Sequence, residues 1–161
     1  MVEPTVPKNE NDRLEALWNM HLLDTKPEER FDVITRKAVE KLQVPVSMIT
    51  LLDKNREWYK SCQGFDKKEM PRKNSFCAHT LGTGQLLIVE DTLEDQRFAD
   101  NPQVIKPPHI RFYAGVPLLE RKSGLVVGVF CVKDTKPRKL SEHELMTLFD
   151  LAREAESELA K

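Results

Sequence analysis

The sequence predicts an α+β sandwich built on an antiparallel sheet. Residues 111–119 and 125–132 are rich in β-branched and aromatic side chains and indicate two strands, the second apolar on both faces like a central strand. The polar segment between them is too short for a crossover, so the two strands must be antiparallel. Helical patterns before, between and after two such hairpins favour helices packed against one antiparallel sheet.

Length and composition favour a single cytoplasmic domain. With 161 residues, 40% of them hydrophobic, the chain can bury a substantial core. Its net charge of -1 gives no electrostatic reason to bind nucleic acid or a membrane surface. Three cysteines without a CxxC pair fit a reducing compartment. We expect a flexible tail over residues 1–11 and one domain over residues 12–161.

Three long helices are expected from apolar residues at helical spacing. The first covers residues 12–22, the second follows Thr25 and the third follows Ser141. Thr25 with Glu28, and Ser141 with Glu144, match the capping box of a helix start. The apolar positions are Leu14, Leu17, Trp18 and Leu22; Phe31, Ile34, Ala38 and Leu42; and Leu145, Leu148, Phe149, Ala152 and Leu159.

Three further strands are expected between these helices. Alternating residues of the second, including Trp58 and Cys62, would lie on one face. Gly115 and Gly128 lie inside the strands of the central hairpin, where glycine often marks a bulge or a close approach of backbone or ligand. The three strands cover residues 46–52, 57–62 and 86–89.

A short helix that carries a thiol and an imidazole is expected between the last two of these strands. Asn74 or Ser75 would cap it, and Gly84 would close it. Cys77 and His79 are two residues apart, so on a helix their side chains diverge by about 200° and form no local catalytic pair. The simpler interpretation is a buried structural thiol with a structural histidine.

The long polar connection over residues 90–108, with a helical turn near residues 94–98, is a second candidate region. Functional residues concentrate in loops held by a rigid scaffold, although aspartate and asparagine also serve as turn formers. No metal-ligand spacing is present among the four histidines, so no metal site is expected. The hydrogen-bonding residues of this region are Asp91, Asp95, Arg97, Asp100, Asn101, His109 and Arg111.

A series of ordered motifs spans nearly the whole chain. They are Leu-Leu-Asp-Thr at 22–25, Pro-Glu-Glu-Arg-Phe-Asp at 27–32, Ser-Phe-Cys-Ala-His at 75–79, Arg-Phe-Ala-Asp-Asn-Pro at 97–102, His-Ile-Arg-Phe-Tyr-Ala-Gly at 109–115 and Gly-Val-Phe-Cys-Val-Lys-Asp at 128–134. Their order resembles the GAF domain family of small sensory modules, and within it a subgroup found in bacterial signalling proteins.

The resemblance implies a six-stranded antiparallel sheet with the terminal helices on one face and a ligand pocket on the other. The connections around residues 75–81 and 90–111 would wall that pocket. It also implies that the terminal helices pair two subunits, so we expect a homodimer that passes a signal along those helices.

We therefore expect a non-catalytic regulatory domain that binds an unidentified small molecule, polar or planar. The sequence does not indicate a cofactor. Arg111 would bind an anionic group of the ligand, Trp58 or Tyr113 would supply an aromatic wall, and Ser75 a hydrogen bond. The expected ligand-binding residues are Trp58, Ser75, Phe76, Cys77, His79, Asp91, Arg111 and Tyr113.

Other functions stay open at this point. One is a thiol-based redox enzyme or sensor, related to the free methionine-(R)-sulfoxide reductases, with Cys77 acting alongside Cys62 or Cys131. The sequence departs from that branch at residues 109–113, which contain no cysteine. It also lacks the Cys-His dipeptide of bilin-binding members, whereas a haem ligand would have to be His79 or His109. A last alternative is a dimerisation module whose pocket is filled by side chains.

Overall fold

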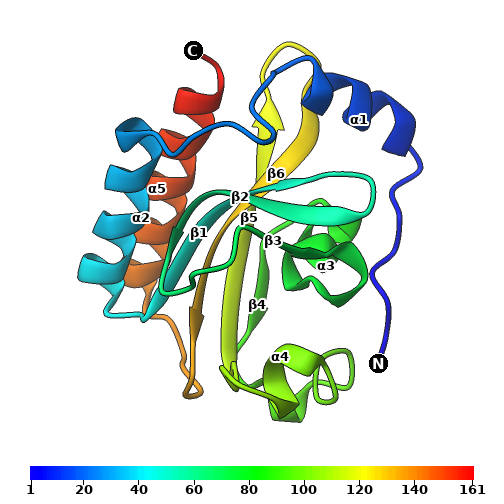
Figure 1. Ribbon diagram of the computed structural model, residues 1–161. Helices are drawn as coiled ribbons and strands as arrows, with labels where there is room; N and C mark the ends of the chain where they lie inside the picture. Colours follow the sequence, from blue (N-terminus) through cyan, green and yellow to red (C-terminus); the bar gives the residue numbers. More distant parts are fainter.

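The computed structural model, which describes residues 1–161, is organised around a six-stranded antiparallel sheet (Figure 1). The strand order is β3-β2-β1-β6-β5-β4. The strand that is apolar on both faces, β6, pairs with β1 on one side and β5 on the other, so it is central as predicted. The strands are β1 (Val46–Leu52), β2 (Arg56–Gln63), β3 (Glu69–Pro71), β4 (Leu87–Val89), β5 (Phe112–Glu120) and β6 (Leu125–Asp134).

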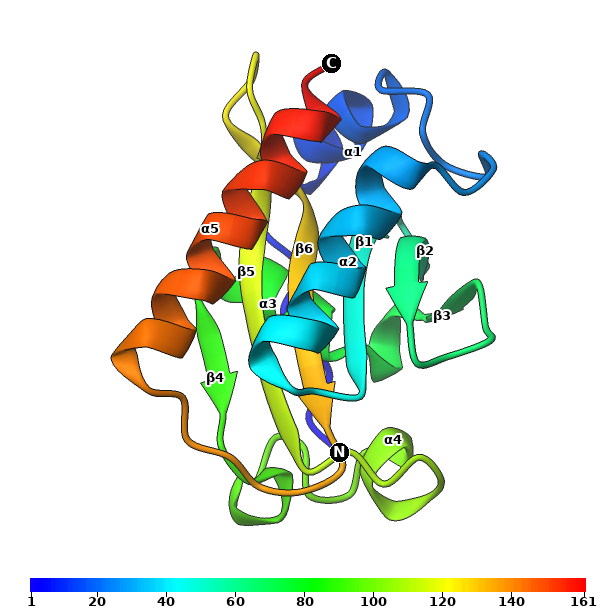
Figure 2. The same ribbon diagram turned by 90° about the vertical axis from the view of Figure 1, so that its left-hand side faces the viewer.

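Two long helices, α2 (Glu29–Leu42) and α5 (Glu142–Leu159), lie side by side across one face of the sheet (Figure 2). A shorter helix, α1 (Glu10–Trp18), packs against β6. Their apolar side chains form one buried cluster with the sheet, including Leu14 and Phe31. Burial of these stripes holds the helices in place. None of the helices combines the length and the apolar character that crossing a bilayer requires.

The opposite face of the sheet carries shorter elements. They are α3 (Phe76–Thr83), α4 (Pro102–Ile105) and two 3-10 turns at Arg72–Asn74 and Thr92–Glu94. The first residues of the chain run alongside α3 (Figure 1), and the terminal ammonium pairs with Asp100 at 2.6 Å. A second buried cluster fills this face and includes Met48, Phe76, Phe98, Tyr113 and Cys131.

The predicted start of the second helix is wrong. α2 begins at Glu29, and Glu28 precedes it in an extended conformation. Thr25 caps no helix, because its hydroxyl donates to the carbonyl of Leu22 and accepts a hydrogen bond from Nζ of buried Lys60 at 2.7 Å. The Thr25 side chain, which the local sequence pattern predicted to cap α2, therefore makes a tertiary contact with Lys60 instead.

The connecting segments also differ from the prediction. The first helix ends at Trp18, because His21 and Asp24 adopt positive φ angles of 55° and 61° that a right-handed helix does not contain. The helical turn expected near residues 94–98 is present, since the backbone N–H of Ala99 donates to the carbonyl oxygen of Asp95 at 2.9 Å, but a 3-10 turn at Thr92–Glu94 precedes it and α4 follows it. Strand β3 is an addition that sequence patterns did not predict.

An irregularity in β2 changes which residues share a face. The pairing of β1 with β2 shifts between Ile49 and Thr50, so that Lys60 has no partner in the regular register. As a result Trp58 joins the cluster under α2 and α5, whereas Cys62 packs on the opposite face. The prediction that Trp58 and Cys62 share a face of the sheet is wrong. It assumed strict alternation along the strand, and one extra residue in β2 moves every later side chain to the opposite face.

The two hairpin glycines mark close approaches, as predicted. A Cβ at Gly128 would collide with the carbonyl oxygen of Thr50 on the neighbouring strand. One at Gly115 would collide with the hydroxyl group of Tyr113. Gly128 therefore lets the backbones of β6 and β1 approach closely, whereas Gly115 leaves room for the Tyr113 hydroxyl of its own strand and for Thr80.

Replacement of Gly128 by alanine should destabilise the protein by about 2 kcal/mol, because the methyl group must displace backbone of β1. Urea unfolding would measure this effect. Arg121→Ala, at an exposed position in the turn after β5, is the control and should change stability by less than about 0.5 kcal/mol. A neutral or stabilising Gly128→Ala, the result expected from strand propensity alone, would contradict this account.

Candidate functional site

The largest cavity lies on the α3 and α4 face of the sheet. Its volume is about 530 Å³, which is within the range of pockets that hold small-molecule ligands. The loop from β2 to β3 forms one side and α4 with the segment that follows it forms the other. The lining residues are Tyr59, Phe65, Asp66, Lys67, Glu69, Met70, Pro71, Asn74, Pro102, Gln103, Lys106, Pro107 and Pro108.

Gln103 is the best-anchored polar side chain of this lining. It sits on α4, whose first turn is capped by Asn101: the Asn101 Oδ1 atom accepts from the Gln103 backbone N–H at 2.9 Å. The Gln103 Nε2 group donates to the carbonyl oxygen of Asn74 at 2.9 Å, and its side chain is buried. α4 is thereby fixed to the turn that precedes α3.

Behind Gln103 lies a fully buried ammonium group. Lys133, near the end of β6, has no exposed surface, and its Nζ donates to Oε1 of Gln103 at 3.0 Å. The same nitrogen lies 5.3 Å from the ring centre of Phe76 and 5.6 Å from that of Phe65, distances typical of cation–π contacts. Burial, the largest single influence, lowers the pKa of Lys133, but Glu57 and the three nearby cysteines together raise this pKa above its ordinary value. The group is therefore a cation at neutral pH.

The compensating carboxylate belongs to Glu57, at the other end of the same face. Glu57 is fully buried, and its Oε1 atom accepts a hydrogen bond from the Ser75 hydroxyl at 2.5 Å. Its Oε2 atom has no hydrogen-bond partner. Ser75 also caps α3, as predicted, by accepting from the backbone N–H of Ala78 at 2.9 Å. One hydroxyl thus satisfies both a helix end and a buried charge.

The buried thiols are poorly suited to nucleophilic chemistry. Cys77 and Cys131 are fully buried, and the Tyr113 hydroxyl donates to the Cys77 sulfur at 3.4 Å. Burial raises the pKa of Cys77 well above its ordinary value, and it raises the pKa of half-buried Cys62 to about 11. At neutral pH these groups are thiols, whereas nucleophilic attack requires the thiolate.

Arg111 and Asp91 bind each other instead of lining the cavity. Two hydrogen bonds join them, from Nε to Oδ1 at 3.0 Å and from Nη2 to Oδ2 at 3.1 Å. The Arg111 guanidinium lowers the pKa of Asp91. The guanidinium fork expected to hold a ligand's anionic group is already engaged with a carboxylate, because the two residues border adjacent strands β4 and β5.

The remaining expected residues lie in three places. Phe76 and Tyr113 are buried side by side in the α3-face core, with ring centres 5.4 Å apart. His79 is half-buried against Phe98, and burial together with Arg97 lowers its pKa, so it is neutral. Trp58 lies on the opposite face of the sheet, covered by α2 and α5. Direct contact between a ligand and any of the eight expected residues stays a prediction.

Sequence reasoning missed three buried polar residues on the cavity side of the sheet: Gln103, Lys133 and Glu57. One indication was present, since Lys133 follows directly on an apolar strand with no charged neighbour before it. A lysine in a strand buried on both faces is rarely structural without a partner. Nothing in the sequence indicated Gln103, whose position depends on the turn at α4.

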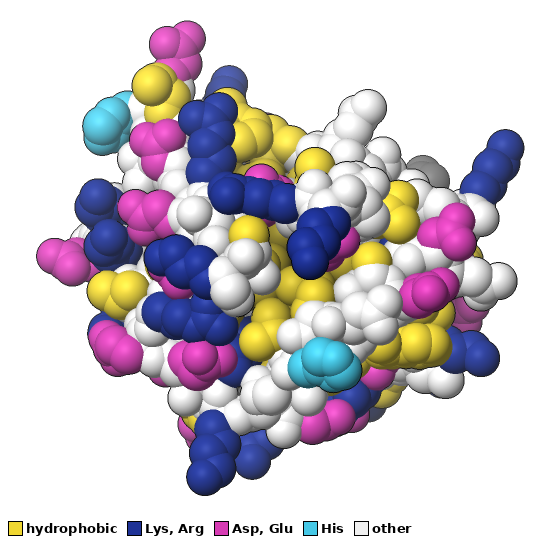
Figure 3. All heavy atoms as spheres, turned by 90° about the horizontal axis from the view of Figure 1, so that it is seen from above, with side chains coloured by type: hydrophobic (Ala, Val, Ile, Leu, Met, Phe, Trp, Pro, Cys, Tyr) yellow, Lys and Arg dark blue, Asp and Glu magenta, His cyan; other side chains and the backbone are white.

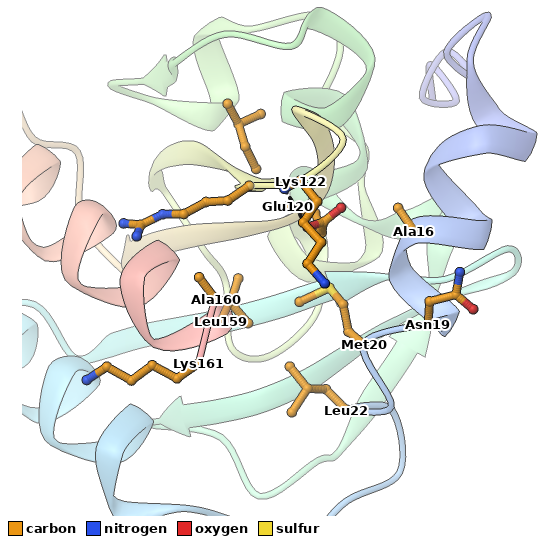
Figure 4. A pocket seen from close by; sticks show the side chains of 11 residues that line it. Ala16, Asn19, Met20, Leu22, Glu120, Lys122, Leu159, Ala160 and Lys161 are labelled. Carbon is orange, nitrogen blue, oxygen red and sulfur yellow. Dashed lines mark hydrogen bonds between the residues drawn. The ribbon is translucent and has the colours of Figure 1, made fainter.

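A second, smaller cavity lies at the opposite end of the molecule, between the end of α1, the β5–β6 turn and the end of α5 (Figure 4). Its volume is about 380 Å³, and Met20, Leu22 and Leu159 lie around it. Seen from above, apolar side chains reach the surface in the middle of this end, with lysine and arginine side chains around them (Figure 3). No buried charged group is among its lining residues, and no three potential metal ligands come together anywhere in the protein.

Comparison with known proteins establishes the family. The sequence pattern of the GAF domain matches residues 26–159. A cyclic di-GMP phosphodiesterase from Pseudomonas aeruginosa is 39% identical over 155 residues, which cover 95% of this chain but only 26% of that protein. The chain therefore belongs to the GAF domain family, as its motifs predicted, and it spans about a quarter of this relative's length.

Solved structures with the same fold have little sequence in common with this chain. The GAF domain of an Acinetobacter phosphoenolpyruvate-protein phosphotransferase matches with a TM-score of 0.64 at 19% identity, covering 93% of this chain and 94% of that one. A free methionine-R-sulfoxide reductase from Neisseria meningitidis, solved with its substrate, matches with a TM-score of 0.62 at 16% identity, covering 99% and 96%. These similarities confirm the predicted fold.

Ser75→Ala should destabilise the protein by about 2–4 kcal/mol, since it removes a helix cap and also leaves both oxygens of buried Glu57 without partners. Ser141→Ala is a matched control, because Ser141 caps α5 in an exposed capping box with no buried partner. Ser141→Ala should lower the free energy of unfolding by only about 1 kcal/mol. Denaturant unfolding of both variants measures the difference, and equal losses would show that the Glu57 contact contributes nothing.

Alkylation of Cys62 by iodoacetamide should be about 100-fold slower than that of an ordinary cysteine at neutral pH, because its pKa is raised to about 11. The rate should rise about tenfold per pH unit up to pH 9 without a plateau. Protein unfolded in urea, in which all three cysteines are exposed, supplies the comparison. A plateau near neutral pH in the folded protein would point to an activated thiolate and so to redox chemistry.

Proposed function

We propose that this protein is a small-molecule-binding regulatory domain that acts in cytoplasmic signal transduction without catalysing a reaction. The observation that supports this proposal is the cavity on the α3 and α4 face, with a buried ammonium group directly behind one wall. Pockets that bind small molecules are typically concave and largely apolar with a few fixed polar groups. Prolines and aromatic rings supply the apolar surface here, and Gln103 is a fixed polar group of the lining with Lys133 directly behind it.

The thiol chemistry of the reductase branch is less favoured. The raised pKa values of Cys62 and Cys77 leave little thiolate at neutral pH, and residues 109–113 have no cysteine. Similarity to the Neisseria enzyme concerns the fold, at 16% identity. A binding role needs none of these thiols to be reactive.

The domain's output would be the control of a signalling enzyme. The Pseudomonas relative is named as a cyclic di-GMP phosphodiesterase and is much longer than this chain. We propose that occupancy of the cavity is transmitted through the sheet to α2 and α5, and that the terminal helices pair two copies of the domain. Met146 on α5, 65% exposed, is an apolar side chain that such an interface would cover.

Native mass spectrometry of the freshly purified protein tests ligand and subunit number together. Extra mass that is lost on denaturation would be a bound ligand, and a doubled protein mass would be the dimer. Phe65→Ala should weaken ligand retention about tenfold or more, because the ring forms one side of the cavity and rests on a surface loop.

The matched control is Met20→Ala, which alters the second cavity instead. It should leave ligand retention unchanged. Loss of the ligand from Met20→Ala but not from Phe65→Ala would move the site to the other end of the molecule. A protein that is always ligand-free, even after incubation with cell metabolites, would leave a dimerisation module as the better description.

A further inference from the structure

The chemistry of the cavity wall indicates what kind of molecule it takes; this inference rests on the proposed function and makes it more specific. Lys133 carries a positive charge with no exposed surface. The carboxylate of Glu57 compensates this charge without a hydrogen bond to Lys133, because its one hydrogen bond is to Ser75. An ammonium group can donate three hydrogen bonds, yet its one protein acceptor is the neutral carboxamide oxygen of Gln103, at 3.0 Å. A buried charge held by one neutral acceptor is far from its most favourable arrangement.

The group that covers Lys133 belongs to the cavity itself. Gln103 lines the cavity and its oxygen faces the ammonium, while Phe65, on the loop between β2 and β3, lies over the same nitrogen at 5.6 Å. Both are side chains of short surface segments rather than of the sheet. Rotation of the Gln103 side chain, which breaks its hydrogen bond to the Asn74 carbonyl oxygen, would open Lys133 to the cavity without disturbing β6.

A carboxamide and a carboxylate are planar groups of nearly equal size that present an oxygen in the same way. A ligand carboxylate could therefore replace the Gln103 oxygen at Lys133, and a charge-assisted hydrogen bond is about twice as strong as a neutral one. We propose that the cavity binds a small monocarboxylate with a flat, apolar body, whose carboxylate displaces the Gln103 side chain and pairs with Lys133.

The rest of the lining supports a single negative charge and an apolar body. The exposed charges at the opening cancel, since Asp66 and Glu69 oppose Lys67 and Lys106. No arginine lines the cavity, although phosphate groups favour the two-point contacts of arginine. Tyr59 and Phe65, with the four prolines of the lining, offer flat apolar surfaces on which an aromatic ring can stack.

The experiment is an NMR titration of the intact protein with benzoate, phenylacetate and 3-phenylpropionate, each beside its primary amide. The amides keep shape and apolar area but lack the charge. Wild-type protein should bind at least one acid about tenfold or more tightly than its amide. Chemical-shift changes should centre on Gln103 and Phe65.

Two variants test whether the ligand carboxylate pairs with Lys133. Lys133→Met keeps the length of the side chain and removes its charge, so acid and amide should bind equally. Gln103→Glu places a fixed carboxylate on Lys133, so binding of the acids should fall about tenfold or more although the lysine is retained. The second variant also covers the case in which Lys133→Met fails to fold. Lys122→Met, at the far end of the molecule, should keep the preference for acids.

The outcomes separate this inference from the function on which it rests. Equal binding of acids and amides to wild-type protein would overturn the role of Lys133 while leaving a ligand cavity in place. If none of the six probes binds, but native mass spectrometry finds another retained molecule that is not a carboxylate, the carboxylate inference fails and the ligand-binding function stands. If no probe binds and no ligand is retained under any condition, both fail.

Discussion

The hydrogen bond between Ser75 and Glu57 is the contact on which the whole α3 side of this domain depends. It joins the first turn of α3 to the second strand of the sheet, and it gives a fully buried carboxylate its one partner, at 2.5 Å. The same hydroxyl caps α3, and the next residue, Phe76, packs between Phe98 and Tyr113. The position of the cavity follows, because the turn that ends at Asn74 forms part of its wall.

The two faces of the sheet are built on different physical principles. Under α2 and α5 a large apolar cluster is stabilised by removing hydrocarbon from water. The polar groups buried beside it have partners: Thr35 and Ser61 share a hydrogen bond, and Lys60 pairs with Glu28 at 2.7 Å. The other face contains Glu57 and Lys133, both fully buried, beside thiols and hydroxyl groups. Such groups reduce stability unless they are satisfied. Glu57 and Lys133 differ from Lys60 in that neither has a salt-bridge partner, and their position beside the largest cavity is the basis of the binding role that we propose.

Local sequence rules succeeded where a single element decides the outcome. The helix cap at Ser75 and the capping box at Ser141 were predicted correctly, because both are contacts within one turn. The central hairpin was equally clear, since a short turn leaves two strands no choice but to pair. Thr25 shows the limit of the same rule, because its hydroxyl went to Lys60, a residue 35 positions away.

The sequence by itself determined the family, the α+β class, the central position of β6 and the apolar stripes that hold α1, α2 and α5 on the sheet. These features depend on periodicity and on neighbours within a few residues. Only the tertiary structure decided that Arg111 is paired with Asp91, that Trp58 lies on the face away from the cavity, and that Gln103 covers Lys133. Each of these depends on one register shift or on one contact between segments distant in sequence, and neither leaves a periodic pattern that a sequence can display.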